Sequence, residues 1–111
     1  MACPKLTMEK KDVQCAISHY VSTNYPDISI QGREHPESLS RVLATIQGNE
    51  YHGAGKYNVL LDIYGSVKEG SIGIKENVHF TSMCSVIVEQ DTNNSPKISI
   101  RGNIYLTKQI F

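Results

Sequence analysis

Near the start of the chain, apolar residues recur at the spacing of a helix. Four of them fall at i, i+4, i+7 and i+8 and would share one face: Val13, Ile17, Tyr20 and Val21. Thr7 precedes them, and its hydroxyl can accept a hydrogen bond from a free N–H of a first turn. Pro26 disfavours helical backbone at the residue before it. The pattern therefore predicts a helix over residues 8–23.

The rest of the chain mostly alternates apolar and polar residues, which is the two-residue period of a strand. Five segments show it: residues 27–31, 39–47, 56–64, 78–89 and 97–106. Gly53 and Gly55 separate the second and third segments, and turn-forming residues fill 91–96 between the last two, so two hairpins are predicted. Residues 32–38 read as a polar connector. Residues 65–77 fit neither period, and we expect a loop with one helical turn at most.

These elements predict an α+β fold, an antiparallel sheet of about five strands in two hairpins with the N-terminal helix packed on one face. The core would combine one face of the helix with one face of each strand. Its predicted members are Val13, Ile17, Val21, Val42, Ala44, Ile46, Ile98, Ile100, Ile104 and Leu106. The apolar residues that share a face or alternate in the other two strands are Tyr57, Val59, Leu61, Ile63, Val78, Phe80, Cys84, Val86 and Val88. No repeat or linker interrupts the pattern, so residues 1–111 are expected to form a single domain.

Charge and cysteine content narrow the function classes. Eleven basic residues balance eleven acidic ones, which argues against a nucleic-acid partner and makes self-association easier. The three cysteines have no metal spacing, and reduced thiols in a cytoplasmic protein are the simplest interpretation. Residues 1–11 lack the apolar stretch of a signal peptide, and no apolar run is long enough to cross a bilayer.

Motifs for catalysis or cofactor binding are missing from the sequence. His35 and Glu37 match half of a zinc-deaminase signature, but its P-C-x-x-C half is absent. The other histidines, His19, His52 and His79, have no partner at metal-ligand spacing. We expect no cofactor, no metal and no enzymatic activity.

Tyrosine is the abundant aromatic residue, with six copies against two phenylalanines and no tryptophan. Tyrosine suits protein interfaces because it buries area and keeps a polar group, although ordinary sheet packing explains it equally well. Leu60 and Tyr64 fall opposite the predicted core face of their strand. The candidate interface residues are Tyr51, His52, Lys56, Leu60 and Tyr64.

The order of elements resembles a family of bacteriophage proteins. The resemblance lies in a short helix, a polar connector, and a hairpin with Ser40-Arg41-Val42, then Gly48-Asn49-Glu50-Tyr51, then Lys56-Tyr57-Asn58-Val59-Leu60-Leu61-Asp62-Ile63, followed by a closing strand over residues 97–106. It covers about residues 10–106. These features are similar to those of the small tail-terminator and head–tail joining proteins of long-tailed phages.

The resemblance implies a structural protein of the virion, found in the host cytoplasm and in the phage particle. It would assemble into a homo-oligomeric ring and dock to tail-tube and head-connector proteins. We expect the ring to form through the sheet edges and the flexible hairpin tip around residues 51–56. The alternative is a small intracellular ligand-binding or enzymatic domain, whose site would lie on a concave sheet face under the helix. A polar pocket there containing His19, Asp62 or His79 would favour that alternative.

Overall fold

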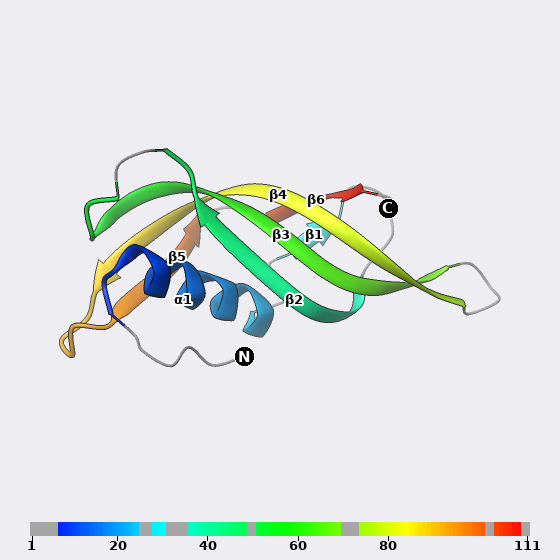
Figure 1. Cartoon of the computed structure of the whole chain (residues 1–111), viewed down its shortest axis with the longest axis horizontal. Coiled ribbons are helices and arrows are strands. Elements are labelled where there is room, and N and C mark those ends of the chain that lie inside the picture. Colours follow the sequence, from blue (N-terminus) through cyan, green and yellow to red (C-terminus); the bar gives the residue numbers. More distant parts are fainter. Residues whose placement is uncertain are drawn as a thin grey trace.

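A computed structural model describes residues 7–24, 28–30, 36–48, 51–69, 74–101 and 104–109. One helix comes first, followed by six strands (Figure 1). The elements in chain order are α1 (Lys10–Thr23), β1 (Ile28–Ile30), β2 (Pro36–Ile46), β3 (Gly55–Glu69), β4 (Ile74–Gln90), β5 (Pro96–Arg101) and β6 (Ile104–Gln109).

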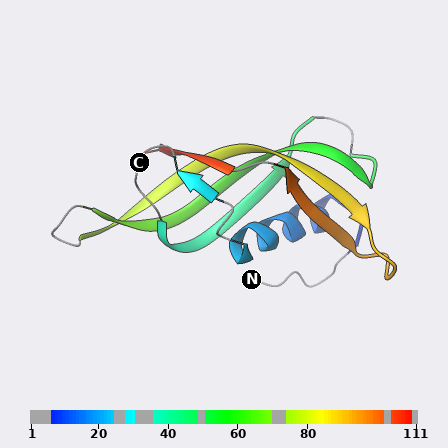
Figure 2. The ribbon, with the colours of Figure 1, turned by 180° about the vertical axis from the view of Figure 1, so that it is seen from behind.

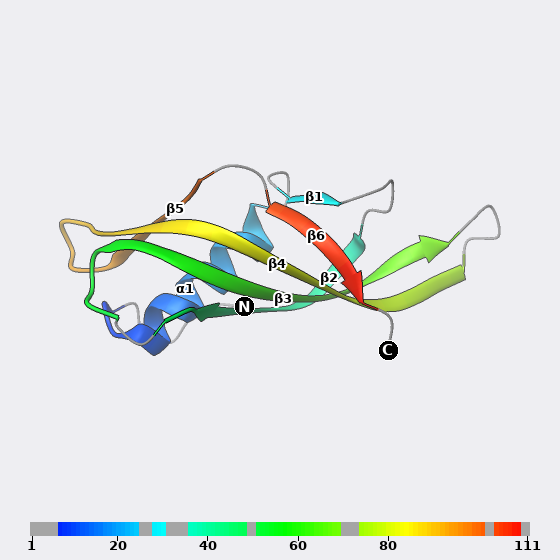
Figure 3. The ribbon, with the colours of Figure 1, turned by 90° about the horizontal axis from the view of Figure 1, so that it is seen from above.

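The long antiparallel strands β3 and β4 lie at the centre of the sheet. β2 pairs with the free side of β3, and β5 and then β6 pair with the free side of β4, all antiparallel. The short β1 runs parallel to β6 (Figures 2 and 3). The predicted α+β class, with one helix on an antiparallel sheet, is confirmed. The count of about five strands is not, because four strands, β2 to β5, form the antiparallel sheet beside the helix, while β6 and β1 extend it at the other end.

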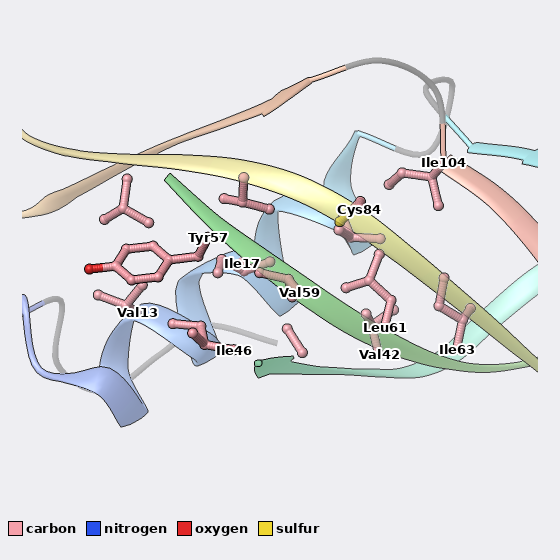
Figure 4. Packing of buried hydrophobic residues seen from close by; sticks show 14 of the residues in the cluster. Val13, Ile17, Val42, Ile46, Tyr57, Val59, Leu61, Ile63, Cys84 and Ile104 are labelled. Atoms are coloured by element: carbon pink, nitrogen blue, oxygen red, sulfur yellow. The ribbon is translucent and has the colours of Figure 1, made fainter. Parts of the chain in front are cut away.

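The core lies between α1 and the concave face of the curled sheet. The helix contacts both β2 and β5, the two strands that flank this face (Figure 1). Val13, Ile17 and Val21 are fully buried, as the helical spacing predicts. Figure 4 shows Val13 and Ile17 facing the side chains of β2 and β3. The strand residues buried against them include Val42, Ala44, Ile46, Tyr57, Val59, Leu61, Ile63, Phe80, Cys84, Val86, Val88 and Ile104.

Most predicted core positions are therefore confirmed. Ile98 and Ile100 are only partly buried at the edge of this core. The side chains of Val78 and Leu106 lie outside the described residues. Ala16 joins the core although the sequence did not single it out, and Tyr20 lies at its boundary.

The predicted strand over residues 97–106 is two strands in the structure. Ser85 pairs with Arg101, and Thr81 pairs with Thr107. Four steps along β4 thus correspond to six along the partner chain, so two extra residues separate β5 from β6. An even insertion keeps the alternation of faces, which is why one continuous strand fitted the sequence pattern.

The prediction of a loop over residues 65–77 is wrong for residues 65–69 and 74–77, while residues 70–73 lie outside the described part of the chain. β3 continues to Glu69 and β4 begins at Ile74, with an unbroken register that pairs Gly65 with Val78 and Glu69 with Ile74. The ribbon projects beyond the rest of the sheet at one end of a molecule 49 Å long (Figure 1). Strand alternation reports a buried face, and a two-stranded ribbon beyond the core need not have one.

The N-terminal prediction also needs two corrections. The helix begins at Lys10, and its N-cap residue, Glu9, forms no side-chain cap. The Thr7 hydroxyl instead accepts a hydrogen bond from Glu9 N (3.2 Å) and donates one to Asp12.

Cys15 is disulfide-bonded, with a partner outside the described residues, whereas Cys84 is a free buried thiol. The interpretation of all three cysteines as reduced is therefore wrong, because an odd count excludes complete pairing but allows a single bridge.

Candidate functional site

The convex face of the sheet, opposite the helix, carries the side chains that the core does not use. We call this the outer face. It consists of every second residue of β2 to β5, the residues whose side chains point away from α1, and the strand register places them side by side. In its central part these are Arg41, Leu43, Thr45, Asn58, Leu60, Asp62, Tyr64, His79, Thr81, Met83 and Ser85.

Several large apolar side chains on the outer face reach solvent. Leu43 is 44% exposed and Met83 is 58% exposed. Leu60, which is half-buried, lies directly opposite Met83 in the register of β3 and β4. Thr45 faces Leu60 from β2, and Leu43 is the neighbouring β2 residue on the same face; Leu43, Leu60 and Met83 together are called the apolar row. The outer face therefore presents an apolar row where a solvated sheet would carry polar residues.

Beside this row, three planar side chains stack across three strands. Tyr64 of β3 lies between Arg41 of β2 and His79 of β4 in the sheet register. The Arg41 guanidinium carbon is 4.4 Å from the centre of the Tyr64 ring. The Tyr64 and His79 rings are parallel within 2°, with centres 4.5 Å apart. Cross-strand neighbours can make such contacts because their Cβ atoms are about 5 Å apart.

An acidic residue anchors the far end of the stack. His79 Nε2 lies 2.9 Å from Asp62 Oδ1, so the imidazole orientation is fixed by a side-chain hydrogen bond as well as by Tyr64. The His79 side chain is 11% exposed and that of Asp62 is 27% exposed. Asp62, His79, Tyr64 and Arg41 thus form a chain of contacts, which we call the Arg41 stack. It leads from a part-buried pair to an exposed cation.

A histidine–aspartate pair can serve catalysis, but this one is poorly placed for it. General acid–base work needs the imidazole within hydrogen-bond reach of a substrate. The Tyr64 ring covers one flat side of His79, and little of the imidazole reaches solvent. The pair is better arranged to hold Tyr64 in place than to transfer protons to a bound molecule.

Metal chemistry finds no support in the described part of the chain. No three histidine, cysteine, aspartate or glutamate side chains gather there as the ligands of an ion would. Nor does the described chain include a helix with the length and apolar character to span a bilayer.

The predicted interface residues Tyr51 and His52 lie in the hairpin tip, the described residues 51–54 before β3, and contact Tyr57 and Met8. The Tyr51 ring stacks on Tyr57 with centres 5.4 Å apart, and its hydroxyl donates to Met8 O. Burial raises the pKa of the Tyr51 hydroxyl. Tyr57 donates to Gly53 O (2.7 Å) and accepts from His52 N (3.1 Å). These contacts hold the loop in place, so it does not extend freely toward another subunit.

The edge of the sheet at β2 is also covered. Two helix side chains accept hydrogen bonds from its backbone: Ser18 Oγ from Ala44 N (3.1 Å) and Gln14 Oε1 from Ile46 N (2.9 Å). An edge strand with unpaired N–H groups can pair with another chain. Here α1 occupies that position along residues 44–46, which disfavours strand addition at this edge.

The structure therefore divides the five predicted interface residues. Leu60, Tyr64 and Lys56 lie on the outer face, while Tyr51 and His52 belong to the tied hairpin tip. Arg41, Leu43 and Met83 were not predicted as site residues, and His79 was named only for the polar pocket of the alternative function. The alternation of residues 39–47 and 78–89 marks which positions oppose the core, so it could have found them.

Comparison with known proteins adds no relative. No protein-family model, no curated protein and no solved structure matches this chain significantly.

Proposed function

We propose that this protein is a non-enzymatic assembly protein that binds protein partners through its outer face. The observation that carries the proposal is the apolar row of Leu43, Leu60 and Met83. These side chains lie opposite a core already filled by α1, so they do not contribute to it. Exposed apolar residues that gather beside polar ones are typical of protein contact sites.

The composition of the outer face supports the same proposal. Methionine, tyrosine and arginine are enriched at protein interfaces, and each is present here as Met83, Tyr64 and Arg41. Their surroundings are rigid, because each lies on a strand of the central sheet. A rigid surface loses little conformational entropy on binding, which favours affinity.

Within this class, we propose a structural protein of phage or prophage origin that acts in tail completion or head–tail joining. It would assemble into a ring of identical subunits and dock to tail-tube and head-connector proteins. The resemblance in the order of elements, the zero formal charge and the α+β class support this. Because α1 covers part of the β2 edge and the hairpin tip is tied, we place the subunit contacts on the outer face and not on these two features.

The alternative, a ligand-binding or enzymatic domain, would need a polar site between helix and sheet. Apolar side chains fill that space (Figure 4). His79 and Asp62 lie on the opposite face of the sheet. One buried polar atom of the described core lacks a hydrogen-bond partner, Ser82 Oγ. A single hydroxyl is too little to bind and orient a ligand, so the assembly proposal is the better supported.

Self-association can be tested by light scattering over a concentration series. Wild-type protein should exceed the monomer mass of 12.4 kDa as concentration rises. Met83→Glu should remain monomeric, because it places a charge in a desolvated contact. Thr92→Glu, in the exposed β4–β5 turn, should assemble as the wild type does. A wild-type mass of one subunit at every concentration would contradict spontaneous ring formation, and equal assembly of Met83→Glu would contradict the outer face as the contact.

The phage assignment needs a separate experiment. A tail-tube protein encoded in the same genome should retain the wild-type chain in a pull-down and should fail to retain Met83→Glu. Retention of both chains alike, or of neither, would contradict docking through the outer face.

A further inference from the structure

We propose that Arg41 is an anion-binding residue that receives a carboxylate from an acidic protein partner. The inference rests on the proposed function only in that it takes the outer face as the contact surface. It adds the chemistry of the partner and the residue that recognises it.

The Arg41 guanidinium is held in place without its hydrogen-bonding capacity being used. It lies over the Tyr64 ring at 4.4 Å, and the residue is exposed. Among the described residues, none of its N–H groups has a hydrogen-bonded or ionic partner. A cation–π contact uses the charge of the guanidinium and leaves its N–H donors available, and their planar fork matches the two oxygens of a carboxylate.

The residues behind Arg41 make this arrangement stiff. Tyr64 is fixed by the parallel His79 ring, and His79 is fixed by its hydrogen bond to Asp62. An arginine on a free side chain loses rotamer entropy when it binds. Arg41 has already lost part of that freedom in the unbound protein, so more of the interaction energy is available for affinity.

The charges of the outer face favour an acidic partner. Over the described side chains of β2 to β5, the residues registered on this face include the bases Arg41, Lys56, Lys97 and Arg101 and the acids Asp62 and Glu89. Asp62 is engaged by His79, and Glu89 lies opposite Lys97 in the register. Among the described side chains this leaves Arg41, Lys56 and Arg101 as positive charges with no acidic neighbour in the register, which attract carboxylates and disfavour basic partners.

The neighbours of Arg41 favour a protein over a nucleic acid. Leu43, two residues along β2, is 44% exposed and can contact an aliphatic side chain next to the carboxylate. Single-stranded nucleic acid binds by stacking bases on aromatic rings. Tyr64 cannot offer its ring, because Arg41 and His79 approach it from the two neighbouring strands.

The probe is a fluorescein-labelled peptide of alternating glutamate and leucine, measured by anisotropy at low salt. A peptide with glutamine in place of glutamate is its neutral counterpart. Wild-type protein should bind the acidic peptide and bind the neutral one about tenfold more weakly. Arg41→Gln should weaken binding of the acidic peptide about tenfold. Arg41→Lys should lose most of the same affinity, because lysine keeps the charge but not the planar, stacked donors.

Arg101→Gln is the matched control. It removes an exposed arginine from the same face, but one that stands over no aromatic ring among the described residues, so it should lose only long-range attraction and weaken binding about twofold, clearly less than Arg41→Gln. Tyr64→Leu should weaken binding through loss of the stack while Arg41 remains. Thermal melts of each variant exclude unfolding as the cause.

The outcomes separate this inference from the assembly proposal. Weaker binding by Arg41→Gln supports the inference even if the wild-type chain stays monomeric, because peptide binding needs no self-association. Equal binding by Arg41→Gln and wild type, or equal losses in Arg41→Gln and Arg101→Gln, overturns it and leaves the ring proposal standing. Tighter binding of a single-stranded DNA of about twelve nucleotides than of the acidic peptide would overturn the assignment to a protein carboxylate.

Discussion

The two faces of β3 differ in what they do. On the inner face, Val59, Leu61 and Ile63 are completely buried against α1 and the neighbouring strands. On the outer face, the intervening Leu60, Asp62 and Tyr64 are only partly covered. Because successive side chains of a strand point to opposite faces, one segment of sequence supplies both the core and the contact surface.

Neighbouring residues of one strand can therefore serve different purposes, one contributing to the stability of the fold and the next to binding. The inner face is apolar apart from positions such as Ser82, and it is filled by one helix. The outer face mixes exposed apolar residues with the Arg41 stack. Substitutions on the inner face should change the free energy of unfolding, whereas those on the outer face should change binding.

The largest effect on stability is expected at Ile17. Ile17→Ala should lower the free energy of unfolding by about 2–5 kcal/mol, because it leaves a cavity among fully buried neighbours. Lys11→Ala on the exposed side of α1 should change it by less than about 0.5 kcal/mol. Urea unfolding followed by circular dichroism measures both, and similar values for the two variants would remove α1 from the core.

A smaller loss is expected where α1 covers the sheet edge. Gln14→Ala should cost about 1–3 kcal/mol, because Ile46 N would lose its acceptor in a partly buried position. Ser22→Ala is the control, since its hydroxyl bonds only the helix carbonyl of His19 among the described residues. Gln14→Ala should also aggregate more readily on storage, as the β2 edge becomes available for pairing. A variant as stable as Ser22→Ala would show that this hydrogen bond does not secure the edge.

On the outer face, Met83→Glu should leave folding nearly unchanged. Met83 is 58% exposed, so the substitution should shift the free energy of unfolding by less than about 0.5 kcal/mol. Because Met83→Glu is also expected to abolish assembly, an unchanged stability would show that the outer face serves binding and not folding. A loss of several kcal/mol would mean that the outer face takes part in the fold itself.

The smallest effect at neutral pH concerns Cys84 on the inner face. Burial raises the pKa of its thiol from 9.0 to about 11. The folded protein keeps the proton that the unfolded chain releases, so this contribution to stability is full below pH 9.0 and is lost as the pH rises toward about 11. Iodoacetamide at pH 8 should label Cys84 slowly in folded protein and quickly in urea, as mass spectrometry can show. Rapid labelling of folded protein would contradict the buried thiol.

Periodicity predicted the regions that have a core to face. The helix and the buried residues of β2 to β4 follow from apolar spacing, and the two predicted hairpins follow from that spacing together with the turn-forming residues between the strands. The ribbon beyond Gly65 did not follow, because it extends past the core and carries no periodic signal. The break between β5 and β6 was hidden, since two extra residues preserve the alternation of faces.

The candidate site could be predicted only in part. Leu60 and Tyr64 were found because they oppose the core face of their own strand. The Arg41 stack depends on which residues of three strands lie side by side, and that register is set by hairpin geometry and a bulge near Arg41. Tyr51 was expected to be exposed because it lies in a turn. In the structure its ring stacks on Tyr57, six residues later in the sequence, and its hydroxyl donates a hydrogen bond to Met8 O. The Cys15 bridge likewise depends on distance in space.

The most direct test of the two-face account compares adjacent leucines. Leu60→Ala and Leu61→Ala remove the same atoms from opposite faces of β3, and both variants are measured by urea unfolding and by light scattering. The account predicts that Leu61→Ala loses about 2–5 kcal/mol of stability. It predicts that Leu60→Ala loses less than about 1 kcal/mol but shifts self-association to higher concentration. Equal destabilisation by the two substitutions, or unchanged association in Leu60→Ala, would contradict the account.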